Sequence, residues 1–464
     1  MSHKKVLILG AGFTGLASAI ELDKLGVQAS IVERSHEVAG LSRTFELAGL
    51  KFELGPHIYF DKDKEVTQFW KSIAGDQMKT YYRNNRIFYD GKFIKSPLNL
   101  LDTVIKLGPI AVFRIVMSYL VDRTKKPSID SAEDWVKSNF GTELFQRFFK
   151  VYNEKIWGIP CSQMAPDWAG QRIKSSLFKM VLKSLTKDKD FIIKTFEFPT
   201  GGSETLYKKQ TDRILNSKHV TLRMGCEATR IQKTPSGFQV TFNNNEEPEE
   251  FTHIISTIHL DHLNSILEPN DFINEKRTRS ALSQLKYRNL ILVNLVFQKE
   301  AVQNFKEHWI DIHDPSISAL RITNFGNHEL GLGDGTRCGI CVEYNCWETD
   351  ELWKLKNEEL VHLALSEMNR MKLTSGSSPI AHEIIRLPRA YPVYFKGYKN
   401  YINTIFEEFK KMDGLILAGR NSLYKWNNMH HSVKTGLLAA RNIVGGNYDL
   451  FSVKGIVSIG KESD

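Results

Sequence analysis

Short apolar runs flank an amphipathic segment at the start of the chain. Residues 6–9 and 29–32 are mostly apolar, and the segment between them carries apolar side chains at helical spacing up to Gly26. Short apolar runs are typical of buried strands, and a glycine after the last periodic residue is a common helix end. The pattern predicts a strand, a helix and a second strand within about 30 residues, the size of one βαβ unit.

Further apolar runs predict strands along the rest of the chain and a helix near its end. The predicted strands cover residues 196–199, 220–224, 238–242, 290–297, 338–344 and 415–418, and the helix covers 433–443. The acidic run at 246–250 lies between two apolar stretches, and we interpret it as a solvated hairpin loop.

The pattern between residues 96 and 194 is helical. Aromatic side chains recur there at intervals of three and four residues, and they are interpreted as a core stripe: Trp135, Phe145, Phe148, Phe149 and Tyr152. Pro109 divides the apolar stretch at 97–121, which predicts two buried helices.

These elements predict an α/β fold with three parts. A discontinuous Rossmann-type dinucleotide-binding domain is expected at residues 1–95, 195–270 and 411–447. An inserted helical domain is expected at 96–194, a mainly β substrate domain at 271–410 and a tail at 448–464. The length of 464 residues agrees with two or three structural units.

Composition narrows the class of protein. Hydrophobic residues make up 42% and charged residues 25%, which is the balance of a folded globular enzyme rather than of a disordered or fibrous chain. The formal net charge of +9 favours anionic partners, which include phosphates, acidic lipids and nucleic acid, without choosing among them. Five cysteines and a start without a targeting pattern favour reduced thiols in the cytoplasm.

The apolar stretch at 97–121 raises the question of a membrane. Asp102, Lys106 and Arg114 lie inside it, and a spanning helix would have to bury their charges in lipid. We therefore expect no transmembrane segment. Weak contact between apolar helices and an acidic membrane surface stays as an alternative.

The first predicted strand ends in a glycine-rich turn. Gly10, Gly12 and Gly15 form the spacing G-x-G-x-x-G, and Glu33 ends the second strand. Gly10 permits the tight turn, Gly12 lets a pyrophosphate approach the backbone, and Gly15 lets helix and strand pack closely. The free N–H groups of the helix attract phosphate, and Glu33 accepts the ribose hydroxyls. The unit predicts a dinucleotide cradle.

The segment after the second strand favours a flavin over a nicotinamide. Residues 40–44 resemble the GG-R-x-x-T-type segment of two-dinucleotide-binding flavoproteins, in which an arginine and backbone amides hold the pyrophosphate. Leu41 replaces the second glycine of that pattern, so Arg43 and Thr44 are the parts that carry over. The resemblance implies FAD as the cofactor.

The rest of the chain resembles the UDP-galactopyranose mutases, particularly the eukaryotic type, within the superfamily that also holds protoporphyrinogen and amine oxidases. The segments that carry the resemblance are 55–60, 155–160 with 167–172, 254–257, 320–325 and 419–429. Residues 55–60 resemble the loop beside the isoalloxazine, and 254–257 resemble the strand that returns to the cofactor domain. Residues 155–160 with 167–172, and residues 320–325, resemble the two segments that each supply a diphosphate-binding arginine. Residues 419–429 resemble the glycine-arginine segment under the flavin.

The resemblance implies roles for individual residues. The implied catalytic residues are His57, Arg172 and Arg321. The implied cofactor-binding residues, besides those above, are Gly419, Arg420, Asn428 and Met429. The implied substrate-binding residues are Arg172, Arg321, Trp157, Tyr424 and Trp426. Independently of the resemblance, Tyr391 belongs to an aromatic group at 391–398 that is a further candidate for lining a sugar or uridine pocket, with core packing as the alternative. This chain departs from the family at Trp426, where mutases usually carry a tyrosine, and at Asn428, near which they carry an acid.

The implied reaction is redox-neutral. In the mutases N5 of reduced FAD displaces the nucleoside diphosphate from the sugar, which opens, closes in the other ring size and is recaptured by the diphosphate. The implied partner is therefore an NDP-hexose, with NAD(P)H as one external reductant and polysaccharide biosynthesis as the setting. No nucleic-acid partner is expected, and the oligomeric state stays open. The alternative is an oxidoreductase of the amine oxidase or protoporphyrinogen oxidase type, and a non-enzymatic flavin-bound scaffold is a third hypothesis.

Histidine and cysteine pairs do not predict a metal site. Cys338 and Cys341 fall on opposite faces of a predicted strand, and no fourth ligand follows at metal spacing. His430 and His431 come just before a predicted helix, where capping is the simpler role. We expect no metal.

Overall fold

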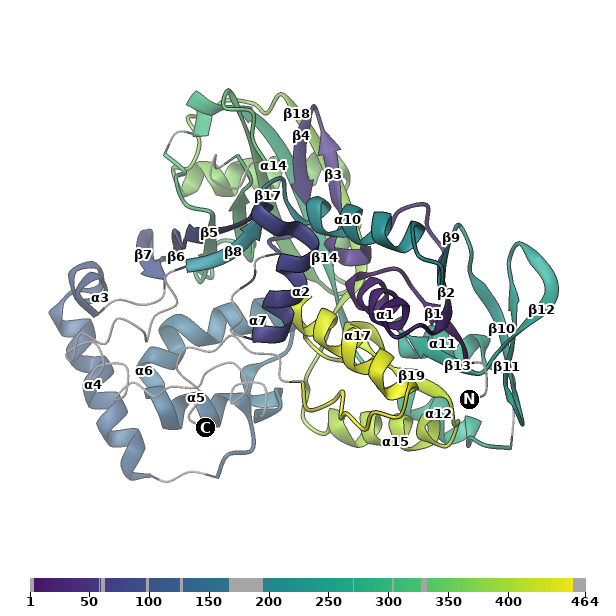
Figure 1. Ribbon diagram of the computed structural model, residues 1–464. Helices are drawn as coiled ribbons and strands as arrows, with labels where there is room; N and C mark the ends of the chain where they lie inside the picture. Colours follow the sequence, from purple (N-terminus) through teal and green to yellow (C-terminus); the bar gives the residue numbers. More distant parts are fainter. Residues whose placement is uncertain are drawn as a thin grey trace.

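A five-stranded parallel sheet brings together strands that lie far apart in the sequence (Figure 1). The computed structural model describes residues 4–57, 59, 63–96, 100–125, 128–166, 195–269, 271–302, 304–326 and 332–453. The strand order is β19 (Leu415–Leu417), β13 (His253–Ser256), β1 (Lys5–Leu9), β2 (Gln28–Glu33) and β9 (Val220–Met224). Every neighbouring pair is parallel. The strands predicted at 6–9 and 254–257 are therefore neighbours in one sheet.

Both faces of this sheet are covered. Val6 and Ile8 pack with one apolar cluster, whereas Leu7 and Leu9 pack with another on the opposite face. The covering elements are α1 (Phe13–Lys24), α10 (Ser203–Leu215) and α17 (Met429–Ile443) on one face, and β10 (Ala228–Thr234), β11 (Gly237–Phe242) and β12 (Asn245–Phe251) on the other. Burial on both faces explains why the first strand is a continuous apolar run.

The acidic run at 246–250 is not the predicted hairpin loop. It lies within β12, which pairs antiparallel with β11 so that Glu249 faces Val240 and Glu250 faces Gln239. The carboxylate of Glu249 lies 2.6 Å from the guanidinium of Arg223. Ladder hydrogen bonds and this ion pair hold a polar sequence in a strand.

A seven-stranded sheet forms the second β layer. Its order is β18 (Ala381–Pro392), β14 (Tyr287–Gln298), β17 (Arg337–Cys346), β16 (Arg321–Asn324), β15 (Trp309–Ile312), β6 (Asn85–Tyr89) and β7 (Lys92–Ser96). The hairpin of β6 and β7 joins its edge through a parallel pairing with β15. The structure departs here from the predicted domain boundary after residue 95, because this hairpin belongs to the mainly β part.

The cysteines of β17 lie on opposite faces, as predicted. Cys338 packs in the cluster beneath α14 (Asn357–Arg370), and Cys341 packs with Phe52 on the other side. Within the described ranges, no three His, Cys, Asp or Glu side chains gather where they could hold a metal ion.

The helical part contains α3 (Leu100–Leu107), α4 (Pro109–Thr124), α5 (Ala132–Phe140), α6 (Thr142–Leu144) and α7 (Val151–Trp157). Pro109 begins α4, as its position between two apolar runs predicted. The prediction that these helices are buried is wrong for α4, because only Ile115 and Tyr119 of that helix are buried. Among the described helices, none has both the length and the apolar content to cross a membrane.

Smaller elements connect these layers. They are the hairpin of β3 (Thr44–Leu47) and β4 (Leu50–Glu53), the pair of β5 (Met78–Tyr82) and β8 (Thr195–Pro199), and the helices α2 (Lys64–Ala74), α11 (Leu260–Ile266), α12 (Glu275–Leu282), α13 (Glu351–Lys354), α15 (Tyr398–Lys410) and α16 (Gly419–Ser422).

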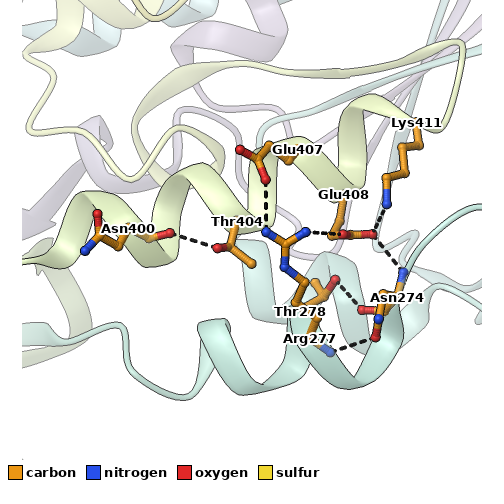
Figure 2. A network of polar contacts seen from close by, with 8 residues as sticks. All are labelled: Asn274, Arg277, Thr278, Asn400, Thr404, Glu407, Glu408 and Lys411. Carbon is orange, nitrogen blue, oxygen red and sulfur yellow. Dashed lines mark hydrogen bonds and ion pairs between the residues drawn. The ribbon is translucent and has the colours of Figure 1, made fainter.

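A polar network joins α12 to α15 (Figure 2). The carboxylate of Glu408 is 1% exposed and accepts hydrogen bonds from the backbone N–H of Asn274 at 2.8 Å and from Arg277 at 3.0 Å. Lys411 lies 2.7 Å from it. The second acid, Glu407, is 62% exposed and contacts the same guanidinium at 3.1 Å. The pKa of Glu408 is held below its usual value by Lys411, the Asn274 N–H and Arg277, against the opposing effect of burial.

We expect Glu408→Gln to lower the free energy of unfolding at pH 7 by about 1–3 kcal/mol, because it removes the charge from three contacts of a buried group. Glu407→Gln is the matched control and should change it by less than about 0.5 kcal/mol. The lowered pKa means that the Glu408 contribution is present above its unfolded pKa and is lost as the pH falls through its folded pKa. Urea unfolding of both variants at pH 7 measures the difference. Equal losses in the two variants would contradict the role of the buried carboxylate.

Candidate functional site

One cavity of about 770 Å³ begins at the glycine turn after β1 and continues to the seven-stranded sheet. It brings together predicted site residues from distant parts of the chain. Those that line it are Gly10, Gly12, Glu33, Arg43, His57, Arg321, Tyr391, Arg420, Trp426, Asn428 and Met429. Those that do not are Gly15, Thr44, Trp157, Gly419 and Tyr424. Arg172, together with 167–172, lies outside the described residues.

The glycine turn leaves open space where a ligand would approach. Gly10 has φ +97°, and a Cβ built on it would lie 2.6 Å from Oγ1 of Thr257. A Cβ on Gly15 would lie 2.0 Å from the carbonyl oxygen of Gly10, which explains the close packing of helix and strand. A Cβ on Gly12, in contrast, would meet no protein atom within 4 Å. The space beside Gly12 belongs to the cavity.

Glu33 holds the turn as well as facing the cavity. Its Oε2 accepts a hydrogen bond from the N–H of Ala11 at 2.9 Å, and its Oε1 accepts one from the N–H of Ser35 at 3.1 Å. Each oxygen keeps a further acceptor position. The carboxylate is thus positioned to accept ribose hydroxyls while it fixes the glycine loop.

The N-terminus of α17 forms another part of the wall. Asn428 caps this helix, with its side chain accepting from the N–H of His431 and its own N–H donating to the ring of His431 at 3.0 Å. This confirms the capping role predicted for His431. Nearby, Gly419 has φ +79°, and a Cβ there would lie 2.5 Å from Oγ1 of Thr14. Gly419 therefore allows close packing on α1 and does not face the cavity.

Arg420 points an incompletely bonded guanidinium into the cavity. It donates to the carbonyl oxygen of Ala390 at 2.7 Å and to that of Asn427 at 3.2 Å, but its buried Nε has no hydrogen-bond partner. The guanidinium lies 4.7 Å from the ring centre of Tyr391. Burial lowers the pKa of Arg420, with a smaller opposing effect from Tyr391 and Tyr394. A guanidinium with neutral neighbours is suited to hold an anion.

His57 is held neutral beside this cation. Its Nδ1 lies 2.7 Å from the carbonyl oxygen of Gly55, which can only accept, so Nδ1 carries the proton and Nε2 is left as an acceptor. Burial, together with the charges of Arg420 and Arg321, lowers the pKa of His57 to about 4, against the opposing effect of the hydrogen bond to Gly55. At neutral pH the cavity therefore contains an imidazole and not an imidazolium.

A buried acid lies behind His57. Glu53 ends β4, and its Oε1 accepts a hydrogen bond from the N–H of Ser203 at 2.6 Å, at the start of α10. Its Oε2 lies 3.8 Å from Nδ1 of His57, too far for a hydrogen bond. Burial raises the pKa of Glu53 to about 7. Glu53 was not among the residues predicted from the sequence. Its position at the end of β4, two residues before Gly55, is the signal that could have indicated it.

Arg321 begins β16 and faces the cavity from the seven-stranded sheet. Its Nε lies 3.2 Å from Oε1 of Glu343, which is 1% exposed. Burial raises the pKa of Glu343, and Arg321 opposes that effect. The negative surroundings, mainly Glu343, raise the pKa of Arg321 despite its burial. Arg321 thus differs from Arg420 in having an ion-pair partner, although the buried Nε of each lacks a hydrogen bond among the described residues.

Asp311, which is the cross-strand partner of Arg321, holds two aromatic side chains of the cavity in place. Asp311 accepts hydrogen bonds from the hydroxyl of Tyr152 at 3.0 Å and from Nε1 of Trp309 at 3.2 Å. Tyr152 stacks on His313, with ring centres 4.4 Å apart. Tyr152 and Trp309 both line the cavity. Tyr152 is partly buried and also packs against the core cluster, as the predicted stripe requires, and Phe145 is buried as predicted.

The aromatic residues form two layers. Tyr391 and Trp426 line the cavity, with ring centres 4.8 Å apart. Trp157 lies behind them, 1% exposed and 4.8 Å from the ring of Trp426. Tyr424 is buried deeper, and its hydroxyl oxygen lies 2.6 Å from the carbonyl oxygen of Lys286, to which it donates, and 3.0 Å from that of Val393. The structure thus gives Trp157 and Tyr424 supporting positions in place of the predicted contact with substrate.

Only part of the segment at 40–44 faces the cavity, because residues 40–43 line it and Thr44 does not. Arg43 lines the cavity and pairs with Glu37 at 2.7 Å. Thr44 begins β3 and lies beside Gly202, away from the cavity lining. Of the two residues of this segment that were predicted to bind the dinucleotide, Arg43 lines the cavity and Thr44 does not.

Comparison with known proteins gives a family and a fold. The sequence profile described as "Flavin containing amine oxidoreductase" matches residues 13–444. Among curated proteins, "Probable UDP-galactopyranose mutase" of Klebsiella pneumoniae is 26% identical over 170 residues, which are 35% of this chain and 44% of the relative. The chain thus matches less than half of the length of this relative.

Solved structures are similar over nearly the whole chain. A reduced UDP-galactopyranose mutase has a TM-score of 0.83 at 20% identity and covers 98% of this chain and 96% of its own. A "Putative protoporphyrinogen oxidase" from Exiguobacterium sp. 255-15 has a TM-score of 0.74 at 18% identity and covers 96% of this chain and 99% of its own. At these identities the likeness establishes the fold, which is shared by both kinds of enzyme.

Proposed function

We propose that this chain, which belongs to the family of flavin-containing amine oxidoreductases, binds FAD in its cavity and uses the reduced form to interconvert the pyranose and furanose forms of an NDP-hexose. The observation that carries the proposal is that a single cavity runs from the glycine turn to Arg321 and Arg420. One end has the groups that a dinucleotide requires, and the other has cations beside aromatic side chains.

The residues present fit FAD. The open space at Gly12 and the start of α1 suit the pyrophosphate, and Glu33 suits the adenosine ribose. Arg420, with its unpartnered Nε, supplies positive charge near His57. Such a charge favours an anionic, reduced flavin over the neutral oxidised form.

The other end of the cavity suits a sugar diphosphate. Arg321 offers a guanidinium to phosphate oxygens, while Tyr391 and Trp426 offer flat faces to a base or a sugar. Tyr152 is fixed by Asp311 next to them. The resemblance of 155–172 to the mutase segment adds Arg172 to this proposed clamp.

Each residue then has a step to perform. Bound reduced FAD supplies a nucleophilic nitrogen and electrons that remain with it at the end of the cycle. Arg321 holds the diphosphate while it is detached from the sugar, because a guanidinium stays charged at any relevant pH. Nε2 of His57 accepts a hydrogen bond without adding charge, and the aromatic wall excludes water.

The alternative is an FAD-dependent oxidoreductase of the amine oxidase or protoporphyrinogen oxidase type. Two observations favour it. Arg321 is already paired with Glu343, so a diphosphate would have to share it, and Trp426 lacks the hydroxyl that mutases usually present. The family name and the oxidase of similar fold point in the same direction.

Turnover without electron consumption separates the two functions. We expect dithionite-reduced enzyme, kept anaerobic, to convert one of a panel of UDP- and dTDP-hexoses for many cycles with no further reductant, as followed by chromatography of the two ring forms. The oxidised enzyme is the control and should be inactive, because it lacks the nucleophilic flavin. Absence of conversion across the panel, together with oxygen-dependent oxidation of an amine or a porphyrinogen, would promote the alternative.

A further inference from the structure

The outward face of α4 is apolar although it faces solvent. Ile110, Phe113 and Leu120 are 72%, 65% and 53% exposed, and Met117 is exposed between them. Their spacing of three and four residues places them on one side of the helix. The opposite side, with Ile115 and Tyr119, is buried against α5 and α6. The helix is therefore apolar on both sides, which is unusual for a helix on the surface of a water-soluble protein.

The neighbouring helix extends this surface. Ile105 of α3 is also largely exposed, and α3 packs against α4. Figure 1 shows both helices at the outer left edge of the molecule, away from the five-stranded sheet. We call the exposed apolar side chains of these helices the α4 surface: Ile105, Ile110, Phe113, Val116, Met117, Leu120 and Val121.

The segment that carries α3 and α4 has more cations than acids. Segment 100–125 contains four cations, Lys106, Arg114, Arg123 and Lys125, and two acids, Asp102 and Asp122. All four cations are exposed, whereas both acids are half-buried.

Both acids are engaged within the protein. Asp102 accepts a hydrogen bond from the N–H of Lys95 at 2.8 Å, and Asp122 accepts one from the N–H of Thr142 at 2.7 Å. Asp122 also pairs with Lys125 at 2.9 Å. The field presented outward by this segment is therefore dominated by its cations.

We propose that the α4 surface docks the protein on an anionic lipid bilayer, with α4 lying in the plane of the interface. An apolar helix face bordered by lysine and arginine is the pattern that inserts shallowly among acidic headgroups. The helix does not cross the bilayer, because its 16 residues at 1.5 Å each are shorter than the hydrocarbon core of about 30 Å.

A second copy of the chain is a less suitable occupant than lipid. A two-fold contact through the α4 surface would place its cations, such as Arg114 and Arg123, near the same cations of the partner. Anionic headgroups neutralise these charges, and the acyl region accepts Phe113 and Leu120. Charge complementarity thus selects the bilayer.

Vesicle binding of the full-length, flavin-loaded protein tests the proposal. We expect it to co-sediment with vesicles of phosphatidylcholine that contain about 30% phosphatidylglycerol, to bind pure phosphatidylcholine more weakly, and to be released from the acidic vesicles by salt. Phe113→Asp should lower the partition coefficient at least about 10-fold, because it removes an apolar anchor and adds a repelled charge. Arg114→Gln should lower it about fivefold.

The matched control is Leu215→Asp. Leu215 ends α10 and is 65% exposed, the same fraction as Phe113, but it lies outside the α4 surface. This variant should bind vesicles like the wild type, and all three variants should keep their flavin and unfolding temperature because the positions are exposed. Absence of vesicle binding, or equal losses for Phe113→Asp and Leu215→Asp, would overturn the proposal. A dimer in solution that Phe113→Asp dissociates, without vesicle binding by the wild type, would assign the surface to a second copy.

Discussion

The Gly12→Val protein is expected to fold but to purify without FAD. A Cβ at Gly12 would meet no protein atom within 4 Å, and the backbone there is extended at φ −71°, so valine causes no clash within the chain. Its methyl groups would instead occupy the part of the cavity that a pyrophosphate needs. The visible absorbance of the purified protein measures the flavin complement, and we expect it to fall to background.

Two controls separate loss of cofactor from loss of fold. The apo forms of wild type and Gly12→Val should unfold at similar temperatures, since the turn itself is undisturbed. Leu25→Val, at the end of α1 and outside the cavity lining, should retain its flavin. A folded Gly12→Val protein with a full flavin complement would count against the dinucleotide cradle.

Arg321→Ala is expected to weaken UDP binding about 10- to 150-fold and to leave FAD bound. The lost charge-assisted contact corresponds to about 1.5–3 kcal/mol. The dinucleotide end of the cavity, around Gly12 and Glu33, does not contact this residue through any described hydrogen bond. Isothermal titration with UDP, on protein of known flavin content, measures the change. The same loss is expected for Arg172→Ala.

The pairing with Glu343 requires its own control. Without Arg321 the buried carboxyl of Glu343 loses the cation that opposes its raised pKa, so it should take up a proton. Arg321→Ala with Glu343→Gln removes that effect and should bind UDP as weakly as Arg321→Ala. Arg337→Ala removes an ion-paired arginine of β17 outside the cavity and should bind normally. Wild-type affinity in both Arg321 variants would refute the diphosphate contact.

The dinucleotide end of the site could be predicted because its signals are local. Gly10, Gly12 and Glu33 fall within one strand, helix and strand, and each has a geometric reason for its identity. The predicted α/β architecture with a parallel sheet and a separate mainly β sheet is confirmed. Arg420 and Arg321 were predicted from the family resemblance, because a single arginine forms no periodic pattern from which its role could be inferred.

The rest of the site depends on contacts between distant segments. Asp311 is joined to Tyr152 across 159 positions of sequence, and Glu53 to Ser203 across 150. A periodic pattern of apolar residues cannot predict hydrogen bonds between residues so far apart in the sequence. Tyr152 packs against the core as its stripe predicted, but its place beside the cavity was not predicted, because helical spacing gives the face of a residue and not whether a cavity opens beside it.

The strand order of the parallel sheet has a consequence for synthesis. The first strand of the chain, β1, lies between β2 and β13, and β13 in turn pairs with β19 at residues 415–417. During translation β13 is therefore made almost 250 residues after β1. Until then β1 has one unpaired edge and one uncovered apolar face. Arg420 follows β19, so the cavity gains this buried cation only after all five strands of the parallel sheet have been made. Until β13 has been made, the open edge and the apolar face of β1 are therefore available for non-native association.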